Sequence, residues 1–277
     1  MSISVADYAR DCAAQGLRGN YAACRSDFTV AQDYDYSAEE QEVWRTLCDR
    51  QTQLTRKLAH VSYLDGIETL GLLDRVPDFD AVSGKLKKLT GWEIVAAPGL
   101  IPAAPFFEHL ASRRFPVTNW LRKKEELDYI VEPDMFHDFF GHVPILTQPV
   151  FADFMQMYGA RAEEAIALGG DLMIERLYWY TAEYGLIREP GRPLKAFGAG
   201  LMSSYTELRF AVESADAHHV PFDLETVMRT GYEIDKFQRA YFVLPSFDAL
   251  KEAFRSADLA ALVGRCKDKP ALDPSAV

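Results

Sequence analysis

Apolar residues that recur at helical spacing are the feature of this sequence that most constrains its fold. They are clearest in residues 37–60, where apolar side chains from Val43 to Leu58 would share one face of a helix. Ser37 with Glu40 three residues later is a capping-box pattern, which is typical of a helix start. Similar patterns predict helices over 61–74, 79–90, 134–142, 149–168, 171–187, the later part of 195–213, and 245–266.

Strand patterns are few and short. WEIVA (residues 92–96) and RAYFVL (residues 239–244) are apolar enough for strands, and KAF at the start of 195–213 is a loop or a short strand. The prolines and glycine between Pro98 and Pro105 predict an irregular loop after the first strand. We therefore expect a mainly α fold with a few short strands.

The two ends of the chain differ in pattern from its middle. Residues 1–35 are polar and mixed, which predicts an irregular arm lying on the body of the protein. Residues 36–266 are expected to form a single domain, because no internal repeat or low-complexity segment divides them. Residues 267–277 are polar and are expected to be a frayed tail.

Charge and composition exclude several classes of protein. The 277 residues include 30 Lys+Arg and 41 Asp+Glu, which gives a formal net charge of −11. This acidic balance argues against nucleic acid or an anionic membrane as the main partner. The sequence has no apolar run of about 18 residues and no secretory signal, and its four cysteines show no metal or disulfide spacing. We expect a soluble, cytoplasmic protein.

The segment PDMFHDFFGHVPIL, residues 133–146, is the clearest sign of chemistry. It contains His137 and His142, two of only six histidines, and paired imidazoles can bind a divalent transition metal. Five steps on a regular α-helix would leave their rings about 140° apart. Convergence on one metal requires the helix to end or distort, which Gly141 and Pro144 could cause. One buried and one exposed histidine near a helix end is the alternative.

Glu183 lies within a second apolar segment, LYWYTAEYGLI, residues 177–187. A carboxylate in such surroundings is costly unless it is paired or bound to a metal. An ion pair with Arg176 or Arg188 would satisfy it. With the two histidines it would complete a two-histidine, one-carboxylate set, which suits non-haem Fe(II) and O₂ chemistry. The same donors also suit catalytic zinc, so the residues alone leave an oxygenase and a hydrolase open.

Aromatic and basic residues near these segments could form a binding site. Phe106, Tyr178 and Trp179 offer flat surfaces that suit a ring-shaped ligand, although aromatic side chains are more often plain core. Arg122 could bind a substrate carboxylate through two parallel hydrogen bonds. A solvated charged face is the ordinary alternative for the RKKEE run in which it lies.

Three segments together resemble a known family. PDMFHDFFGHVPIL, LYWYTAEYGLI and KAFGAGLMSSYTEL occur in the order and spacing of the pterin-dependent aromatic amino acid hydroxylases, and resemble most its single-domain bacterial phenylalanine 4-hydroxylases. The resemblance covers roughly residues 36–255. It implies a largely α-helical catalytic fold, Fe(II) rather than zinc, tetrahydrobiopterin or a related tetrahydropterin as co-substrate, O₂, and conversion of L-phenylalanine to L-tyrosine.

The resemblance also implies roles for individual residues. The iron ligands would be His137, His142 and Glu183, with Tyr178 beside them as a further catalytic residue. The pterin contacts would be Gly99, Leu100, Ile101, Phe106, Asp138 and Tyr178. The substrate contacts would be Arg122, Tyr129, Pro133, Trp179, Ser203 and Val243.

Substrate choice and assembly are implied by smaller features. Trp179 and Val243 resemble the phenylalanine enzymes of the family, whereas Asp138 replaces the glutamate of many members. The short flanking segments imply a monomer without the regulatory domain of animal members. The alternatives are a tryptophan hydroxylase of the same family, a zinc hydrolase built on the same donors, and a catalytically inactive binding protein.

Overall fold

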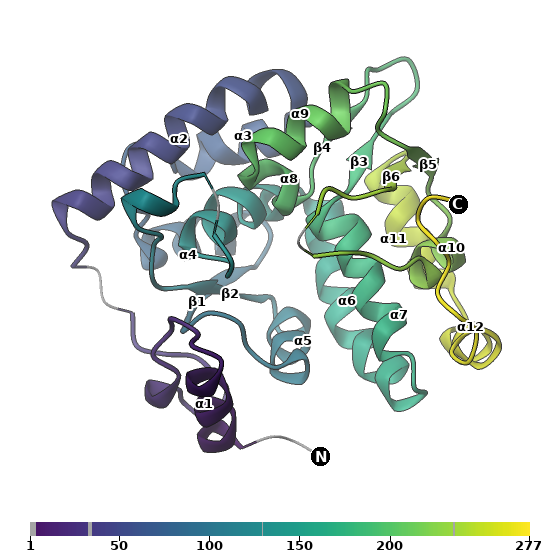
Figure 1. The fold of residues 1–277 in the computed structure, drawn as a ribbon, viewed down its shortest axis with the longest axis horizontal. Coiled ribbons are helices and arrows are strands. Elements are labelled where there is room, and N and C mark those ends of the chain that lie inside the picture. Colours follow the sequence, from purple (N-terminus) through teal and green to yellow (C-terminus); the bar gives the residue numbers. More distant parts are fainter. Residues whose placement is uncertain (1–3, 33–34, 129, 235) are drawn as a thin grey trace.

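The computed structural model describes residues 4–32, 35–128, 130–234 and 236–277. Helices make up most of this part of the chain, which confirms the prediction of a mainly α fold (Figure 1). The α-helices are α1 (Val5–Ala14), α2 (Ala38–Leu58), α3 (Val61–Leu70), α4 (Phe79–Leu89), α5 (Ala103–Ala111), α6 (Pro149–Ala167), α7 (Asp171–Tyr178), α8 (Ala199–Ser203), α9 (Tyr205–Glu213), α10 (Leu224–Arg229), α11 (Phe247–Ser256) and α12 (Leu259–Cys266).

Helix α2 begins where the sequence predicts. The Ser37 hydroxyl accepts a hydrogen bond from the Glu40 N–H, and the Glu40 carboxylate accepts one from the Ser37 N–H, so both halves of the capping box are present. The apolar face of α2 is buried, and Trp44 on that face donates from its indole N–H to the carbonyl of Leu72. Burial of this stripe fixes α2 on the body of the protein.

Two small sheets lie among the helices. Strands β1 (Glu93–Ala97) and β2 (Arg114–Thr118) pair in parallel, with α5 as the crossover between them. A four-stranded sheet has the order β4-β3-β6-β5, formed by β3 (Leu186–Ile187), β4 (Lys195–Ala196), β5 (His219–Pro221) and β6 (Tyr241–Leu244). The predicted strands are therefore present as β1, β4 and β6. The sequence patterns did not indicate β2, β3 and β5.

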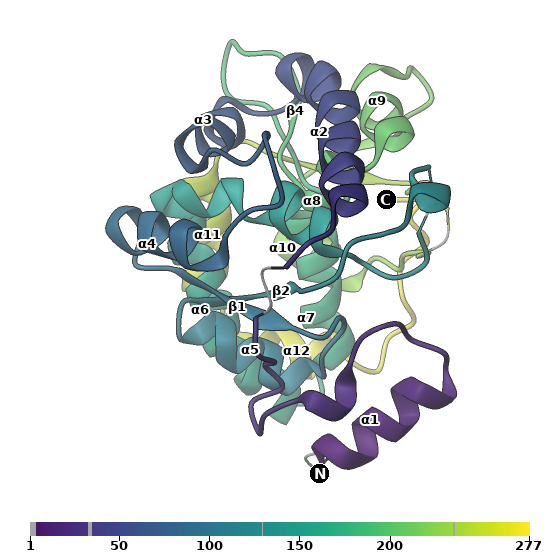
Figure 2. The same cartoon turned by 90° about the vertical axis from the view of Figure 1, so that its left-hand side faces the viewer.

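The N-terminal arm is more regular than predicted. It contains α1, whose first turn is capped by the Ser4 side chain accepting from the Asp7 N–H. Figure 2 shows α1 lying against the end of the molecule that holds β1, β2 and α5. The Val30 N–H donates to the Ala96 carbonyl of β1, and a ring nitrogen of His109 on α5 lies 2.8 Å from the Asp27 carbonyl. The arm does lie on the body, but the prediction that it is irregular is wrong for α1, and outside α1 and the short turn Tyr21–Ala23 its described residues are irregular.

Three further boundaries differ from the predictions. The loop after β1 is shorter than expected, because α5 begins at Ala103. The helix expected over 245–266 is two helices, and Asp258 caps the second by accepting from the Ala261 N–H. The tail is anchored rather than frayed at Leu272, which donates to the Arg229 carbonyl and accepts from the Gly231 N–H.

The core is rich in aromatic side chains. The segment that carries His137 contributes Phe136, Phe139 and Phe140, all fully buried, and Phe139 packs edge-on against Phe79 of α4 with ring centroids 4.8 Å apart. This segment therefore runs through the interior, and its backbone is fixed from several sides. Among the described residues, no helix combines the length and the apolar character needed to cross a bilayer.

Candidate metal centre and its cavity

A π-helical turn, His137–His142, solves the spacing problem of the two histidines. The Val143 N–H bonds to the Asp138 carbonyl five residues back, at 3.2 Å, instead of to the residue four back. A turn widened to an i→i+5 bond brings residues five apart to the same side of the helix. The two imidazoles consequently face each other, with ring centroids 5.0 Å apart.

Close backbone packing accompanies this turn. A Cβ at Gly141 would lie 2.9 Å from the Ala199 carbonyl oxygen, so only glycine allows α8 to approach so closely. Pro144 starts the 3₁₀ turn Pro144–Thr147 that follows. The helix is therefore distorted near Gly141 and Pro144, the two residues that the sequence suggested as the cause of a distortion.

A second π-helical turn, Trp179–Glu183, continues α7 and ends at the acidic member of the set. The Tyr184 N–H donates to the Trp179 carbonyl at 2.9 Å, again five residues back. Gly198 packs on the backbone of this turn, because a Cβ there would lie 2.4 Å from the Glu183 carbonyl oxygen. The chain leaves the helix directly after the carboxylate and enters β3.

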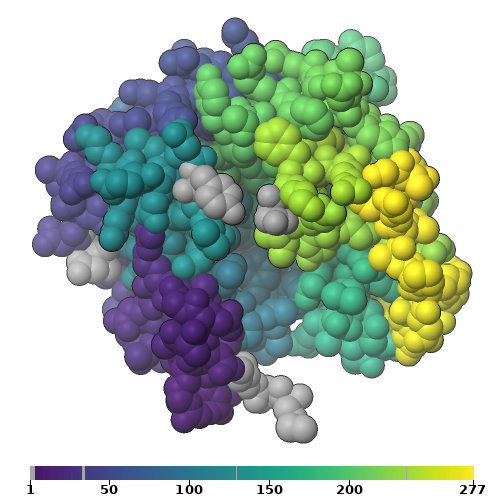
Figure 3. Space-filling model, in the orientation of Figure 1, coloured from purple at the N-terminus to yellow at the C-terminus, as the bar shows by residue number. Residues whose placement is uncertain are grey.

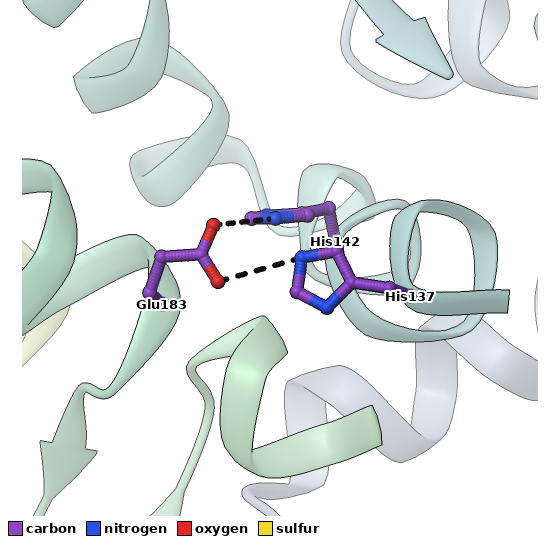
Figure 4. A group of neighbouring side chains, drawn as sticks. All are labelled: His137, His142 and Glu183. Atoms are coloured by element: carbon purple, nitrogen blue, oxygen red, sulfur yellow. Dashed lines mark ion pairs between the residues drawn. The ribbon is translucent and has the colours of Figure 1, made fainter. Parts of the chain in front are cut away.

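The three side chains converge on one point (Figure 4). Nε2 of His142 lies 2.9 Å from one carboxylate oxygen of Glu183, and Nε2 of His137 lies 3.5 Å from the other. One donor atom from each residue lies within 4.8 Å of the other two. Neither Arg176 nor Arg188, the partners considered from the sequence, takes part in this cluster.

Ser203 on α8 fixes the orientation of His137. Its Oγ lies 2.9 Å from Nδ1 of His137 and donates to the Ala199 carbonyl, also at 2.9 Å. Because the hydroxyl hydrogen points to Ala199, the oxygen accepts the Nδ1–H of His137. Nε2 is therefore the ring nitrogen that faces Glu183, and in the neutral imidazole it would carry the lone pair that binds a metal.

The charges of the cluster depend on one another. Burial alone would raise the pKa of Glu183, but His142 and His137 hold it well below its usual value. Burial alone would lower the pKa of His137, and Glu183 raises it to about 8. The fully ionised carboxylate is the form that binds a cation.

The donor set fits a divalent transition metal. Two imidazole nitrogens and one carboxylate, all on one side of the point where they meet, leave coordination positions open toward the adjacent cavity. A metal there would replace the contacts that the three side chains now make with one another. The same donors accept iron or zinc, so this geometry does not decide between the two.

A cavity of about 280 Å³ opens beside the three donors. Figure 3 shows the molecule hollowed between the N-terminal arm in purple and the yellow-green segment across from it. Pockets of this size accept small organic ligands. Its wall contains the three donors together with Gly99, Leu100, Ile101, Ala103, Phe106, Phe107, Phe115, Pro116, Thr118, Pro133, Asp138, Tyr158, Glu175, Tyr178, Trp179 and Tyr232.

All residues predicted to contact the pterin line this cavity. Phe106 packs edge-on against Tyr178, with ring centroids 5.5 Å apart, and Tyr178 lies 5.9 Å from the ring of His142. Asp138 accepts a hydrogen bond from the Thr118 N–H at 2.7 Å, and its burial raises the pKa of the carboxyl group. Burial also raises the pKa of Tyr178 well above its usual value, which keeps the phenol neutral.

The residues predicted to contact the substrate are divided. Pro133 and Trp179 line the cavity, and Trp179 stacks on Tyr232 at 4.3 Å while donating from its indole N–H to Gln238. Tyr129 lies outside the described residues. The other three are not among the residues that line it: Arg122, Ser203 and Val243.

Arg122 is buried in an ion pair that the sequence patterns did not indicate. Its Nε and Nη2 donate to the two carboxylate oxygens of Asp134 at 2.8 and 2.9 Å, and its backbone N–H donates to the same group. Asp134 also accepts from the His137 N–H at 3.1 Å. Arg122 is thus no part of a solvated face, and Asp134 links it to the π-helical turn that carries the histidines.

Sequence reasoning missed several residues of the cavity wall. Tyr232 and Glu175 both line it, and burial raises the pKa of Glu175. Glu175 lies on α7, one helical turn before Trp179, so the helix periodicity could have placed it near the cavity. No local pattern marks Tyr232, because a long-range contact brings it to Trp179.

Comparison with known proteins agrees with this fold. A profile of the biopterin-dependent aromatic amino acid hydroxylases matches residues 18–261. The chain therefore belongs to this family.

Individual relatives narrow the class further. The chain is 80% identical over 275 residues to a phenylalanine-4-hydroxylase of Mesorhizobium japonicum, covering 99% of this chain and 100% of the relative. A crystal structure of Chromobacterium violaceum phenylalanine hydroxylase is 47% identical and superposes with a TM-score of 0.89 over 95% of this chain and 94% of that one. A form of the latter enzyme with iron and phenylalanine bound is 45% identical, with a TM-score of 0.87 over 97% and 96% of the two chains.

These findings confirm the predicted family, fold and enzyme class, including the dependence on a pterin and on iron. They favour phenylalanine 4-hydroxylation over the tryptophan hydroxylase and the zinc hydrolase. A fully inactive binding protein would not need the converged donor set that this chain retains.

Proposed function

We propose that this enzyme converts L-phenylalanine to L-tyrosine at an iron held by His137, His142 and Glu183. The observation that carries the proposal is the convergence of these three donors at the wall of an aromatic cavity. Bound iron and tetrahydropterin supply the activation of O₂ and two electrons. The side chains of this protein position the reactants, hold protons and exclude water.

The pterin would bind between Phe106 and the loop Gly99–Ile101. Phe106 offers a ring held by its edge-on contacts with Tyr178 and Phe115. The loop offers backbone groups that can bind the polar edge of a flat heterocycle. Asp138 lies in the same wall, and its carboxylate, fixed by the Thr118 N–H, would hold water or a pterin N–H.

The amino acid would bind on the side of Trp179 and Pro133. Stacking on Tyr232 and the hydrogen bond to Gln238 fix the indole of Trp179 as a flat wall for the aromatic ring. Arg122 would hold the substrate carboxylate, since Asp134 orients its guanidinium and leaves Nη1 without a partner among the described residues. In this arrangement Ser203 acts through His137, and the contact of Val243 with the substrate stays a prediction.

The second contribution of the protein to the reaction is the exclusion of water from the cavity. The aromatic wall formed by Phe106, Phe107, Phe115, Tyr158 and Tyr178 leaves little polar surface near the donors. Exclusion of water protects a reactive oxidant from being quenched and strengthens the electrostatic interactions in the site. Proton movements would therefore be limited to the few polar groups present, of which Asp138 and Glu175 are partly buried carboxyls with raised pKa values.

A competition assay tests the proposal directly. Purified protein with Fe(II), tetrahydrobiopterin and O₂ is given an equimolar mixture of L-phenylalanine, L-tyrosine and L-tryptophan, and the products are resolved by mass. We expect tyrosine from phenylalanine, dependent on both iron and pterin. Hydroxytryptophan as the main product would overturn the substrate assignment, and absence of any product from the iron-loaded, folded protein would overturn the activity.

We further propose that the enzyme acts as a cytoplasmic monomer in phenylalanine catabolism, with 36–266 as its catalytic domain. Three of its four cysteines are buried as free thiols, Cys12, Cys48 and Cys266, which suits a reducing compartment. The acidic net charge suits small-molecule substrates rather than nucleic acid or membranes. Light scattering on a size-exclusion column would report a mass near 31.2 kDa for the monomer, and a stable tetramer would contradict it.

A further inference from the structure

Residues 98–101 lie on the side of the cavity where the pterin would bind, and we call them the pterin-side loop. The N-terminal arm contacts the backbone of this loop. The hydroxyl of Tyr8 on α1 donates to the carbonyl of Leu100 at 3.1 Å. Gly19 lies so close to the Pro98 carbonyl that a Cβ at this glycine would be 1.9 Å from the oxygen. Tyr21 makes the third contact. Its hydroxyl packs against Gly99, where a Cβ would lie 2.7 Å from the hydroxyl oxygen. The loop is thus held along consecutive residues by a segment about 80 to 90 positions away in sequence.

A second set of contacts holds the arm itself in place. Both terminal nitrogens of Arg18 donate to the Glu126 carboxylate, and its backbone N–H donates to Glu132 at 3.1 Å. The hydrogen bonds from Arg18 lower the pKa of Glu126 to about 2. The guanidinium also lies 4.9 Å from the ring centre of Trp120, whose indole N–H donates to the Pro98 carbonyl at 2.8 Å.

The positions of these contacts connect two walls of the cavity. On one side the arm meets the loop Gly99–Ile101, and on the other it meets the segment that ends at Pro133. Burial of apolar surface explains why Phe28 and Val30 lie against the body. It does not explain why polar groups of Tyr8 and Arg18 bond to residues beside the cavity.

We propose that residues 4–32 form a brace that holds the pterin-side loop in its binding geometry, with Tyr8 and Arg18 as positioning residues. The proposal rests on the proposed function, because it requires that this loop bind the pterin. A ligand recognised by backbone groups depends on the backbone being fixed before binding, since ordering the loop at the moment of binding lowers affinity. Loss of the brace should therefore weaken pterin binding and leave the metal centre unchanged.

Two substitutions each delete polar contacts of the brace and change little else. In Tyr8→Phe the ring keeps its edge-on contacts with Tyr21 and Phe28, at 5.8 and 5.5 Å, and loses only the hydroxyl. Arg18→Gln removes the pair with Glu126 and the contact with Trp120. Arg10→Gln is the matched control for the second variant, because Arg10 is an exposed cation of the same arm whose ion pair within the described ranges is with Asp7. Tyr205→Phe, on the exposed surface of α9, is the control for the first.

Three measurements are made on the Fe(II)-loaded, full-length protein. The first is amide hydrogen exchange of peptides that cover residues 98–104. The second is the Kd of 7,8-dihydrobiopterin, measured anaerobically by calorimetry. The third is the KM for tetrahydrobiopterin beside kcat and the KM for phenylalanine. Iron content, measured by mass spectrometry, shows whether the metal centre is intact.

We expect faster exchange in residues 98–104 for both brace variants and for neither control. The Kd and the KM for the pterin should rise about fivefold in Tyr8→Phe, as for loss of one neutral hydrogen bond, and more in Arg18→Gln. The iron content, kcat and KM for phenylalanine should stay within twofold of the wild type.

Unchanged exchange in both brace variants would overturn the brace. Faster exchange with an unchanged Kd for the pterin would overturn its role in binding. An equal rise in the KM values for pterin and phenylalanine, with falling kcat, would indicate general loosening and would also contradict it. Failure of the proposed function is distinguishable, because exchange and dihydrobiopterin binding are measured without turnover.

Discussion

The two walls of the cavity are held in different ways. The metal wall consists of two π-helical turns inside the core, where Ser203 orients His137, and the glycines Gly141 and Gly198 allow neighbouring backbones to approach. The pterin wall is a loop at the surface, and much of its support comes from two other segments of the chain, the N-terminal arm and the segment of Trp120. Interior packing should preserve the first wall when surface contacts are cut, whereas the second should respond to them.

Removal of a metal ligand should have the largest effect. Glu183→Ala deletes the only carboxylate of the set, so we expect bound iron and turnover to fall by more than the roughly 100-fold that loss of an outer-shell partner costs. The cavity and the π-helical turns should remain, because core packing holds them. Iron analysis, the product assay and circular dichroism measure the three effects. Glu164→Ala on the surface of α6 is the control, and full activity of a folded Glu183→Ala protein would refute the assignment.

Removal of Asp134 should have the largest effect on stability. This fully buried carboxylate accepts from Arg122 and from the His137 N–H, and Asp134→Ala leaves a buried guanidinium unpaired. We expect the free energy of unfolding to fall by about 3–5 kcal/mol in denaturant titrations. Asp128→Ala removes the exposed partner of Arg50 and should change it by less than about 1 kcal/mol. An equal fall in the free energy of unfolding in both variants would contradict the claim that burial makes the Arg122–Asp134 pair costly to break.

Loss of the hydroxyl behind His137 should weaken the metal centre alone. Ser203→Ala removes the acceptor of the Nδ1–H, so the imidazole is free to rotate or to change tautomer. We expect iron affinity to fall about 10- to 100-fold, with the Kd for 7,8-dihydrobiopterin unchanged. Metal competition with a chelator measures the affinity. Ser204→Ala, the neighbouring cap of α9, is the matched control, and equal iron affinity in both variants would argue against the orienting role.

Strain in the pterin-side loop should weaken the other wall alone. Gly99 has φ +147°, and its alanine variant would carry a Cβ 2.7 Å from the Tyr21 hydroxyl. We expect the KM for tetrahydrobiopterin to rise about tenfold with unchanged iron content, since strain of about 1–3 kcal/mol displaces the loop. Gly191→Ala also has positive φ but meets no atom within 4 Å, so it controls for strain elsewhere. The double variant Tyr21→Phe/Gly99→Ala should recover part of the affinity, and failure to do so would place the cause in backbone strain alone.

Acidification should have the smallest of these effects. Burial lowers the pKa of His109, whose ring bonds to the Asp27 carbonyl of the arm. Below about pH 6.5 the unfolded chain binds a proton at this residue that the folded chain does not. The free energy of unfolding should therefore fall as the pH drops from 6.5 toward the folded pKa, by at most about 1.4 kcal/mol per unit.

The variant His109→Gln isolates this contribution. His60 is also buried with a lowered pKa, so the difference between the variant and the wild type is the informative quantity. Denaturant titrations between pH 7 and pH 5 should show a shallower loss of stability in His109→Gln. Identical slopes would mean that His109 does not titrate in this range.

Local patterns predicted much of the fold. The capping box at Ser37 and the apolar stripe of α2 each reflect interactions within a few residues. Both can therefore be recognised from the sequence alone. The same rule could have found α1, because Ser4 followed by Asp7 repeats the cap pattern. Strand β2 was missed because Pro116 argues against a strand, yet a two-stranded sheet can tolerate proline at its edge.

The three donors of the candidate site were predictable from the sequence, but their geometry was not. A spacing of five residues contradicts convergence on a regular helix, and only the i→i+5 turn removes that contradiction. The residues themselves suggested the three donors as one of several possibilities, and the family resemblance favoured that set before any geometry was known. The bond from Ser203 to His137 and the stacking of Tyr232 on Trp179 join residues more than 50 positions apart, which no local pattern describes.

The anchored tail makes the two ends of the chain matter for protein engineering. Leu272 forms backbone hydrogen bonds with Arg229 and with Gly231, which directly precedes Tyr232 of the cavity wall. The arm contacts another wall of the cavity, at Leu100. Figure 1 shows α1 well apart from the C-terminal end of the chain. An affinity tag or fusion partner attached at either end is therefore joined to a segment that contacts a different wall of the same cavity. A pair of fluorophores at the two ends would turn that sensitivity into a reporter of pterin and substrate binding.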